Sequence, residues 1–511
     1  MSNESHDRSD VETDRRTDDS ERSTVDRRAF SRAVGLGVVG SIATLDRLSV
    51  RGSGGSSQRE NEDADENAIA AENARSGDGG WEPATLVDGD LEGYTTATSV
   101  QTGETLELCV SAGGSYRTEI YRIGWYDGDG GRLVANTAGS EPRQQPIVTA
   151  EGAYDMVECD WDVTDRLEVG EDWTSGLYYA WLVRTDGDGS YAHPFVVRSS
   201  RPSADVVVQL PLATQQAYNG WPGADRGGKS LYGFSSDGWR ADAVSHDRPY
   251  EAPFDHHLTY AVHLVRWLER EGYSIEYLCD SDVHRNPERV REYAVAVSAG
   301  HDEYWSLAQY DAFLSAREDG TNLAVLGANV CYWRVHYEDD GRTIYCPKIE
   351  AEDLFRNIGR HEARLLGLAS FGYQPDGRYP SLTVDASGLE HDYLADTGFE
   401  PGDRVDGVVG HEWAWIHDES PDDLHRFFHY EAGSQFEVQR DRDCDTVAFT
   451  ADSGATVFHC GTLAWPWRLD PDPTWDTTYP FAEARRHDPT VSEPDERLQR
   501  FQANVFRDLL E

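Results

Sequence analysis

Residues 293–314, YAVAVSAGHDEYWSLAQYDAFL, join an apolar run, a charged turn and an amphipathic segment. Alternating Ala and Val up to Ser298 predict a buried strand, whereas apolar residues spaced three or four apart from Leu307 to Leu314 predict a helix. Ser306 is placed to cap the first turn of that helix. Ligands bind beyond the carboxyl ends of the strands in an open α/β sheet. The turn between strand and helix, which carries a base, two carboxylates and a phenol, is therefore a predicted functional site, although surface turns also collect charged residues.

The alternation of strands and helices continues on both sides of this stretch, from about residue 201 onward. The expected strands are residues 206–210, 274–278 and 323–326, and the expected helices are residues 258–272 and 288–292. Such alternation predicts a parallel, Rossmann-like (glutamine amidotransferase-like) α/β domain across residues 201–511. Polar residues follow successive strands and are expected along one edge of the sheet: Tyr218 with Asn219, Asp280, His301 with Glu303, and Asn329.

Residues 81–200 show strand signals and no helical period. Alternation at residues 104–110 and a strand-like run at residues 117–125 are followed by turns rich in Gly and Asp and by two further strand-like segments. Short strands with such turns predict an Ig-like β-sandwich. The chain is thus expected to be an α+β multidomain protein, with the sandwich first and the α/β domain second.

Residues 1–80 are predicted to be a leader and a linker rather than part of the fold. Arg27-Arg28 and Phe30 precede a mildly apolar stretch at residues 33–45, an arrangement that resembles a Tat export signal. The stretch is too short and too rich in small residues for a stable membrane span. Residues 53–80, rich in Ser, Gly, Glu and Asn, predict a disordered linker. These features predict export through the Tat pathway, an extracellular or cell-surface location, and no membrane span after signal removal.

The charge balance is strongly acidic: 46 Lys and Arg residues face 93 Asp and Glu residues, a formal net charge of −47 at pH 7. Lysine occurs only at Lys229 and Lys348, and the acidic residues are spread over the whole chain. This distribution is typical of enzymes adapted to high salt, where salt screens the repulsion between carboxylates. A disordered acidic protein is excluded by the aromatic content of 11%. Nucleic-acid binding is not expected, because no basic stripe could neutralise phosphates.

The 7 cysteines are scattered and form no C-x-x-C motif, so neither a zinc ribbon nor a dithiol redox site is indicated. Cys331 and Cys346 flank an expected hairpin at Asp340-Gly341 and are the pair that could join after export.

A set of short motifs occurs in order along both expected domains. They are Tyr121-Arg122 with Gly124-Trp125-Tyr126-Asp127-Gly128, Ser175-Gly176-Leu177-Tyr178, Gln216-Ala217-Tyr218-Asn219, Asp247-Arg248-Pro249-Tyr250, Gly300-His301-Asp302-Glu303-Tyr304-Trp305 and Gly327-Ala328-Asn329. Together they resemble the large (β) subunit of N,N-dimethylformamidase and its relatives. The resemblance extends from about residue 81 to the C-terminus.

The resemblance implies an amidohydrolase with one iron ion, expected as Fe(III), that is held by two tyrosinates and one glutamate. Motif by motif, these metal ligands correspond to Tyr178, Tyr218 and Glu303. Phenolates and carboxylates are hard anionic donors that balance a trivalent cation and leave positions open for water and substrate. Tyr178 would come from the sandwich, so the metal would tie the two expected domains together.

The resemblance also implies catalytic residues beside the metal. His301 corresponds to a catalytic histidine, Asn329 to an active-site asparagine, and Glu412 is the candidate for a further catalytic glutamate, with Glu437 as its alternative. His301 or Glu412 would take a proton from a metal-activated water, and Asn329 would stabilise the developing oxyanion. The expected substrate is a small linear amide whose C–N bond is cleaved. The expected partner is a small subunit or a second copy of the chain.

Two other classes of function stay open from the sequence. A glycoside hydrolase would use Asp302 or Glu303 with a second carboxylate about 5–10 Å away and no metal. A non-catalytic carbohydrate-binding or surface-binding protein would use the sandwich as its adhesive module. The candidate residues also have ordinary structural roles open to them, such as a helix cap for Glu303 or a turn residue for Asn329.

Overall fold

The computed structural model describes residues 67–79, 81, 89–233, 235–251, 256–373, 378–432, 442–470 and 493–511. Residues 67–511 form one compact unit. The predicted export signal and Glu437 lie outside the described residues. Among the residues that are described, no helix combines the length and the apolar composition needed to cross a lipid bilayer.

The first described segment is a short helix, α1 (Ala68–Asn73), where the sequence predicts a disordered linker. The side chain of Asn67 caps this helix. Ile69 and Glu72 are buried, and the Glu72 carboxylate is paired with Arg132. The prediction of a disordered linker is therefore corrected for residues 68–73. These residues form a helix because a capped turn buries an apolar side chain and pairs a charge.

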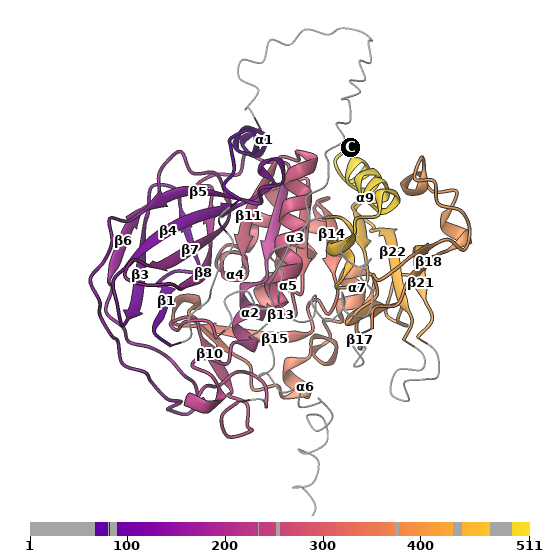
Figure 1. The fold of residues 1–511 in the computed structure, drawn as a ribbon. Helices are drawn as coiled ribbons and strands as arrows, with labels where there is room; N and C mark the ends of the chain where they lie inside the picture. The colour runs from indigo at the N-terminus through magenta and orange to yellow at the C-terminus, as the bar shows by residue number, and fades with distance from the viewer. Residues whose placement is uncertain are drawn as a thin grey trace, which may run out of the picture. The chain divides into compact units, whose positions relative to one another are not determined.

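In the first half of the described chain, two sheets pack face to face (Figure 1, indigo to purple). One has the strand order β1-β3-β6 and the other the order β2-β8-β7-β4-β5. Their strands are β1 (Leu91–Thr95), β2 (Ser99–Gln101), β3 (Thr105–Ala112), β4 (Tyr116–Ile123), β5 (Gly131–Asn136), β6 (Asp165–Glu168), β7 (Gly176–Arg184) and β8 (Ser190–Arg198). Side chains from both sheets, such as Leu108 and Ile120, share one core. The predicted two-sheet arrangement is observed, whereas its Ig-like assignment stays a prediction.

The second half is built on a mixed sheet with the order β11-β9-β12-β14-β23-β22-β21-β18-β19. Its strands are β9 (Val206–Leu210), β11 (Ile275–Cys279), β12 (Val295–Gly300), β14 (Asn322–Gly327), β18 (Leu382–Val384), β19 (Arg404–Val405), β21 (His425–Tyr430), β22 (Cys444–Thr450) and β23 (Thr456–His459). Strands β11, β9, β12, β14 and β23 run parallel, and the rest pair antiparallel. The predicted parallel strands are thus present, while the Rossmann-like and amidotransferase-like classification stays a prediction.

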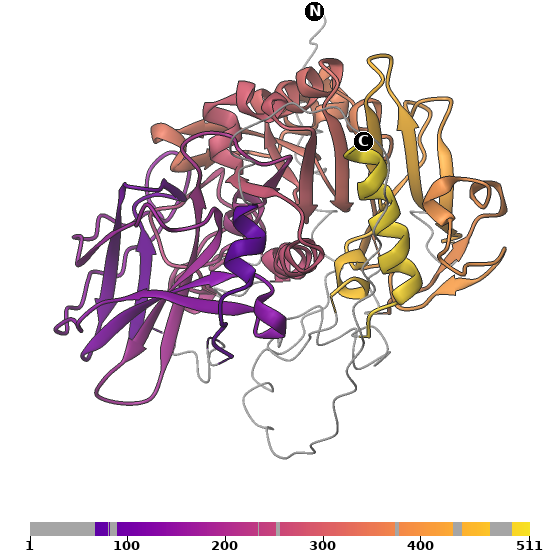
Figure 2. The ribbon, with the colours of Figure 1, turned by 90° about the horizontal axis from the view of Figure 1, so that it is seen from above.

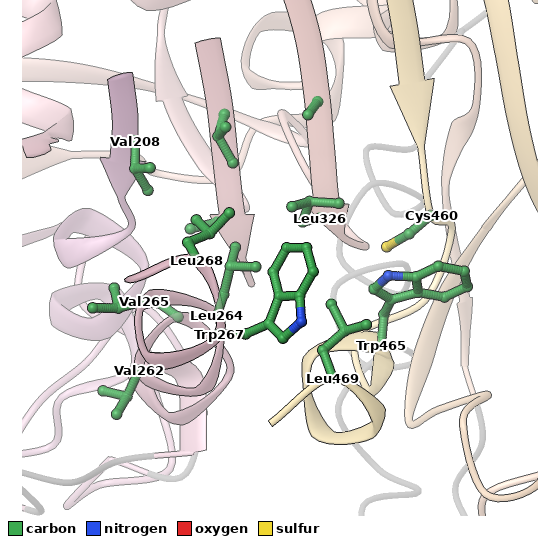
Figure 3. Close-up of a cluster of buried hydrophobic side chains, with 14 of the residues drawn as sticks. Val208, Val262, Leu264, Val265, Trp267, Leu268, Leu326, Cys460, Trp465 and Leu469 are labelled. Atoms are coloured by element: carbon green, nitrogen blue, oxygen red, sulfur yellow. The ribbon is translucent and has the colours of Figure 1, made fainter. Parts of the chain in front are cut away.

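Helix α3 (His256–Glu271) packs against this sheet beside β12, at the position predicted for a helix. Its Trp267 lies beside Leu326 of β14, and Leu264, Leu268 and Trp465 belong to the same apolar cluster (Figure 3). These side chains are essentially inaccessible to solvent. Each such buried side chain stabilises the fold by about 1.5–3 kcal/mol, so the contact fixes α3 against the strands that lead to the predicted site.

The remaining elements cover or extend these sheets. The other strands are β10 (Ala243–Ser245), β13 (Tyr304–Ser306), β15 (Trp333–Glu338), β16 (Thr343–Tyr345), β17 (Ala369–Tyr373) and β20 (Glu412–Trp415). The other α-helices are α2 (Leu212–Tyr218), α4 (Asp280–Arg285), α5 (Leu307–Glu318), α6 (Glu350–Asp353), α7 (Glu362–Leu366) and α9 (Glu496–Leu509). Helix α9 lies beside the C-terminal strands of the sheet (Figure 2, yellow). Its Phe501 contacts Phe428 of β21 and Phe458 of β23. The C-terminal helix therefore completes the core there.

The sandwich and the α/β part share buried side chains. Tyr179 and Trp181 of β7 belong to the same apolar cluster as the α3 residues. Arg122 of β4 makes two hydrogen bonds, of 2.9 and 2.8 Å, to the carboxylate of Glu269 in α3, and neither side chain is exposed. The domain boundary predicted at residue 200 stays a prediction. In the structure, the sandwich and the α/β part share one core.

All seven cysteines lie among the described residues, and each is a buried free thiol. Cys331 and Cys346 are therefore not joined to each other in this structure.

Candidate active site

The turn after β12 carries the predicted site, and its geometry depends on its first residue. Gly300 has a φ of 66°, and a Cβ at this position would lie 2.8 Å from Cβ of Tyr260 in α3. Glycine alone tolerates both the dihedral angle and so close a contact. The chain then passes through His301 and Glu303 into β13 and α5, where Ser306 caps the helix as predicted.

Helix α2 brings a phenol to the same place. It follows β9 and ends at Tyr218, whose hydroxyl donates a hydrogen bond of 2.8 Å to Oε2 of Glu303. The backbone amide of Glu303 in turn donates a hydrogen bond of 3.0 Å to Oγ1 of Thr214, one turn earlier in α2. Strands β9 and β12 are parallel neighbours, so the segments that follow them meet at the same edge of the sheet. The predicted meeting of Tyr218 and Glu303 is thus present in the structure.

A second tyrosine, Tyr232, completes a cluster of oxygen atoms around Glu303. Its hydroxyl lies 3.2 Å from Oε2 and 3.4 Å from Oε1 of Glu303. Its ring stacks on that of Tyr218, with the ring centroids 4.1 Å apart. Burial and, after it, the negative charge of Glu303 raise the pKa of the Tyr232 hydroxyl well above its ordinary value. A phenolate at this position would therefore need a neighbouring cation.

His301 and Glu412 lie directly beside this cluster. Nε2 of His301 is 3.4 Å from Oε2 of Glu303 and 3.1 Å from Oε2 of Glu412, the first residue of β20. The exposed fractions are 0% for His301, 3% for Glu303 and 2% for Glu412. Burial opposes protonation of His301, but the carboxylates of Glu412 and Glu303 outweigh it and raise the pKa of His301 to about 9. The histidine is therefore placed to hold a proton between two carboxylates.

Asn329 faces the same space from the end of β14. Its φ of 49° is left-handed, a conformation that Asn tolerates better than most residues. Its Nδ2 donates a hydrogen bond of 3.0 Å to Oε2 of Glu412 and lies 3.2 Å from Nε2 of His301. The three residues predicted to act in catalysis are therefore neighbours, although Glu412 is separated from the other two by a long stretch of chain.

Tyr178 does not join this group. Its hydroxyl donates a hydrogen bond of 2.6 Å to the carbonyl of Thr174, and its ring stacks on Trp173 with centroids 5.3 Å apart. The residue belongs to the core between the two sandwich sheets, whereas Tyr179 faces the α/β part. Successive side chains of a strand point to opposite faces. The prediction that Tyr178 shares a metal centre with Tyr218 and Glu303 is therefore corrected, because its position on β7 turns it inward.

Tyr232 lies beside Glu303, where the resemblance implies Tyr178. It lies in a loop between α2 and β10, outside every segment with a strand or helix period. None of the motifs and spacings described above includes this residue. Only the three-dimensional path of the loop brings its hydroxyl to Glu303.

Asp302 is turned away from the cluster, although it stands between His301 and Glu303. Its Oδ2 accepts hydrogen bonds of 2.7 Å from Gln209 and 2.8 Å from Ser298. Burial raises the pKa of this carboxyl to about 6. Asp302 therefore joins the ends of β9 and β12, and it does not face the space around His301 as a glycosidase acid would need to do.

The spacing of the oxygen atoms fits a single cation. Ligand oxygens that lie about 2.0–2.2 Å from one ion are about 3 Å from each other. The hydroxyl oxygens of Tyr218 and Tyr232 lie 2.8 and 3.2 Å from Oε2 of Glu303. Hard, anionic oxygen donors suit a highly charged cation such as Fe(III). The residues present thus fit the expected metal, with Tyr232 in place of Tyr178.

The sequence is similar to known proteins of one family. The sequence model of the family described as N,N-dimethylformamidase beta subunit-like, C-terminal, matches residues 117–478. The N,N-dimethylformamidase beta subunit of Paracoccus aminophilus is 25% identical over 174 residues, which cover 29% of this chain and 23% of that protein. The N,N-dimethylformamidase beta subunit of Alcaligenes sp. matches with the same identity over the same shares of both chains. The matched region therefore spans about a quarter of the length of these curated relatives.

Proposed function

Because the chain belongs to the N,N-dimethylformamidase beta subunit-like family, we propose that it is a metal-dependent amidohydrolase that cleaves the C–N bond of a small linear amide. The observation that carries this proposal is that two phenol oxygens lie within hydrogen-bond distance of the same carboxylate oxygen. We assign Tyr218, Tyr232 and Glu303 as the ligands of one iron ion, in the Fe(III) state.

Charge supports this assignment. Glu303 and Glu412 are two buried carboxylates that both lie beside His301, at 3.4 and 3.1 Å from its Nε2. Buried charges are stable only when they are paired, so this group favours a further cation. Iron bound to the three oxygens would polarise an amide carbonyl and lower the pKa of a coordinated water.

The remaining residues have separate roles in the proposed reaction. Glu412 accepts the proton of the attacking water, and His301, at 3.1 Å from Glu412, passes a proton to the leaving amine. The Nδ2 group of Asn329 donates a hydrogen bond to the oxygen on which charge develops. In the overall reaction, a bond forms between the water oxygen and the carbonyl carbon, and the C–N bond breaks. Since His301 and Glu412 are almost fully buried, the favoured substrates are small.

The metal is tested by elemental analysis and visible spectroscopy of the purified chain loaded with Fe(III). We expect one iron per chain and a phenolate-to-iron absorption band, both of which are lost in Tyr218→Phe, Tyr232→Phe and Glu303→Gln. Tyr178→Phe is the matched control, since it removes a buried hydroxyl elsewhere and should keep iron and band. The ligand assignment is overturned if Tyr178→Phe loses the band and Tyr232→Phe keeps it.

The reaction is tested by following amine release from a series of formamides and acetamides. We expect His301→Ala to retain iron and to lose about 10²–10⁴-fold in rate. Activity that survives complete removal of the metal would instead favour a metal-free hydrolase, such as a glycosidase that uses a pair of carboxylates.

Export, salt adaptation and a partner chain also belong to this proposal. The twin arginines Arg27-Arg28 and the apolar residues that follow support export by the Tat pathway. The net charge of −47 supports adaptation to high salt. The matched relatives are named as beta subunits, so we propose that this chain also assembles, either with a small subunit or with a second copy of itself.

A further inference from the structure

We infer that Tyr304 and Lys348 are positioning residues that hold Tyr232 and weaken it as a metal donor. This inference rests on the proposed function, since it concerns the same oxygen cluster. It assigns a role to two residues that neither contact the proposed metal nor take part in the proton transfers described above.

Tyr304 contacts the oxygen atom of Tyr232 directly. The two hydroxyl oxygens are 2.6 Å apart, which is at the short end of the range for O–H···O hydrogen bonds. Tyr304 is fully buried and stands at the start of β13, where it pairs with Trp333 of β15. With Tyr232 bound to a cation as a phenolate, the Tyr304 hydroxyl becomes the donor of this hydrogen bond.

Lys348 contacts the ring of the same tyrosine. Its Nζ lies 3.4 Å from the ring centroid of Tyr232, and 5.5 and 5.3 Å from the ring centroids of Tyr304 and Trp333. An ammonium group over an aromatic face is attracted by the ring, by about 0.5–2 kcal/mol depending on solvent exposure. The residue has a φ of 55°, an unusual backbone angle for a lysine. The guanidinium of Arg240 donates a hydrogen bond of 3.0 Å to the carbonyl of Pro347, the residue before Lys348.

Lysine is rare in this chain: of the 46 Lys and Arg residues, only Lys229 and Lys348 are lysines. A lysine at this position therefore suggests that its properties matter there. A lysine ammonium is a compact point charge, whereas the guanidinium of arginine is planar and spreads its charge. A compact charge can lie centrally on the face of a single ring, as Lys348 does on Tyr232.

The hydrogen bond of Tyr304 and the shortest Lys348 contact both fall on Tyr232, whereas the ring of Tyr218 meets that of Tyr304 edge to face with centroids 6.4 Å apart. The ring of Tyr218 stacks on Tyr232 at 4.1 Å and lies near His301, with centroids 5.8 Å apart. Tyr232 instead carries the hydrogen bond from Tyr304 and the cation–π contact with Lys348. Both contacts withdraw electron density from a phenolate oxygen, so they make Tyr232 a weaker donor than the same phenolate would be without them. A weaker second phenolate leaves the cation more acidic toward water and substrate.

The test uses the full chain loaded with Fe(III) and measures iron content and the phenolate-to-iron absorption band. Removing either contact raises the energy of the phenolate electrons, so we expect Tyr304→Phe and Lys348→Met to shift the band to longer wavelength. Lys348→Arg retains the charge in a more spread form, so it should shift the band less than Lys348→Met does. Tyr310→Phe is the matched control, because it removes another buried hydroxyl, whose partner is the carbonyl of His361, and should cause no shift.

Each outcome separates this inference from the proposed function. If the wild-type chain binds no iron or shows no band, the proposed ligand set fails first. If the wild-type band is present and neither Tyr304→Phe nor Lys348→Met moves it, the positioning role is wrong while the ligand set stands. Loss of iron in Tyr304→Phe with full iron in Tyr310→Phe supports the holding role. Lys348→Met lies at a half-buried position, and it keeps the inference testable if Tyr304→Phe does not fold.

Discussion

At Glu303, one carboxylate oxygen lies within 3.4 Å of two phenol hydroxyls and of Nε2 of His301. A buried carboxylate with this many hydrogen-bond donors is held in one position, so the site does not need to reorganise when a cation or substrate arrives. Its neighbour Asp302 is used differently, since Gln209 and Ser298 hold it in the scaffold. In this turn, Glu303 thus faces the proposed site, whereas its neighbour Asp302 holds the scaffold.

Asn329→Ala should lower kcat by about 10²–10³-fold, the usual cost of removing one donor to a developing oxyanion. Iron content should stay at the wild-type value, because Asn329 contacts Glu412 and His301 and none of the proposed metal ligands. Amide hydrolysis and elemental analysis measure the two effects. The exposed residue Asn357 supplies a control, and an Asn329→Ala variant with the activity of Asn357→Ala would contradict the assigned role.

A buried carboxyl outside the site predicts a pH dependence of stability. Burial raises the pKa of Asp445 from 3.8 to about 6, and the residue is 3% exposed. A raised folded-state pKa means that its stabilising contribution is complete below pH 4 and is lost as the pH rises toward 6. The change in the free energy of unfolding caused by Asp445→Asn should therefore be more stabilising at pH 7 than at pH 4, by about 3 kcal/mol at most. Denaturant unfolding at both pH values measures this difference, and parallel pH profiles for variant and wild type would exclude it.

At the scale of elements, the site depends on how strands end. Parallel neighbours β9, β12 and β14 each lead into a segment that carries a site residue. Helix α5 begins immediately after the turn, and Ser306 and Gln309 exchange hydrogen bonds between side chain and backbone at its first turn. The cap fixes where the turn ends, and it thereby limits the positions open to His301 and Glu303.

Ser306→Ala should reduce the free energy of unfolding by about 1–2 kcal/mol, because the first turn of α5 loses its cap. The same hydroxyl also contacts Nδ1 of His284 at 2.9 Å, which adds to the cost. Ser315→Ala, at an exposed position within the same helix, should be neutral or slightly stabilising. Equal stability of the two variants would show that the cap is not important for this helix.

At the scale of the whole molecule, the sandwich and the α/β part are held together by a common core and a buried ion pair. The predicted metal link through Tyr178 is not needed for this contact, because Arg122 and Glu269 already join β4 to α3. The two parts should therefore unfold together.

Arg122→Met should lower the free energy of unfolding by about 3–5 kcal/mol, since it leaves the Glu269 carboxylate buried without its partner. Arg117→Met is the matched control, because Arg117 pairs with Glu119 at a partly exposed position and should cost less than about 1 kcal/mol. Calorimetry should show one transition for both variants. Separate transitions for sandwich and α/β part would contradict the shared core.

The net charge predicts a salt dependence for the entire chain. With 93 acidic and 46 basic residues, repulsion between carboxylates should destabilise the fold at low ionic strength. Raising KCl from about 0.1 M to about 1 M shortens the screening length from about 10 Å to about 3 Å. The thermal midpoint should rise accordingly, and a midpoint that stays constant or falls would rule out salt adaptation of this kind.

The sequence by itself determined the elements and residues that local patterns control. Alternating apolar residues predicted β12, the spacing after Ser306 predicted α5, and the resemblance identified Tyr218, His301, Glu303, Asn329 and Glu412, which the structure brings together. Tertiary structure alone decided the rest. The pairing of β18, β19, β21 and β22 beyond the parallel strands depends on contacts distant in the chain, which leave no period in the sequence. Tyr178 and Tyr232 show the same limit: which side of a strand faces which core, and where an irregular loop returns, are fixed by packing between distant segments.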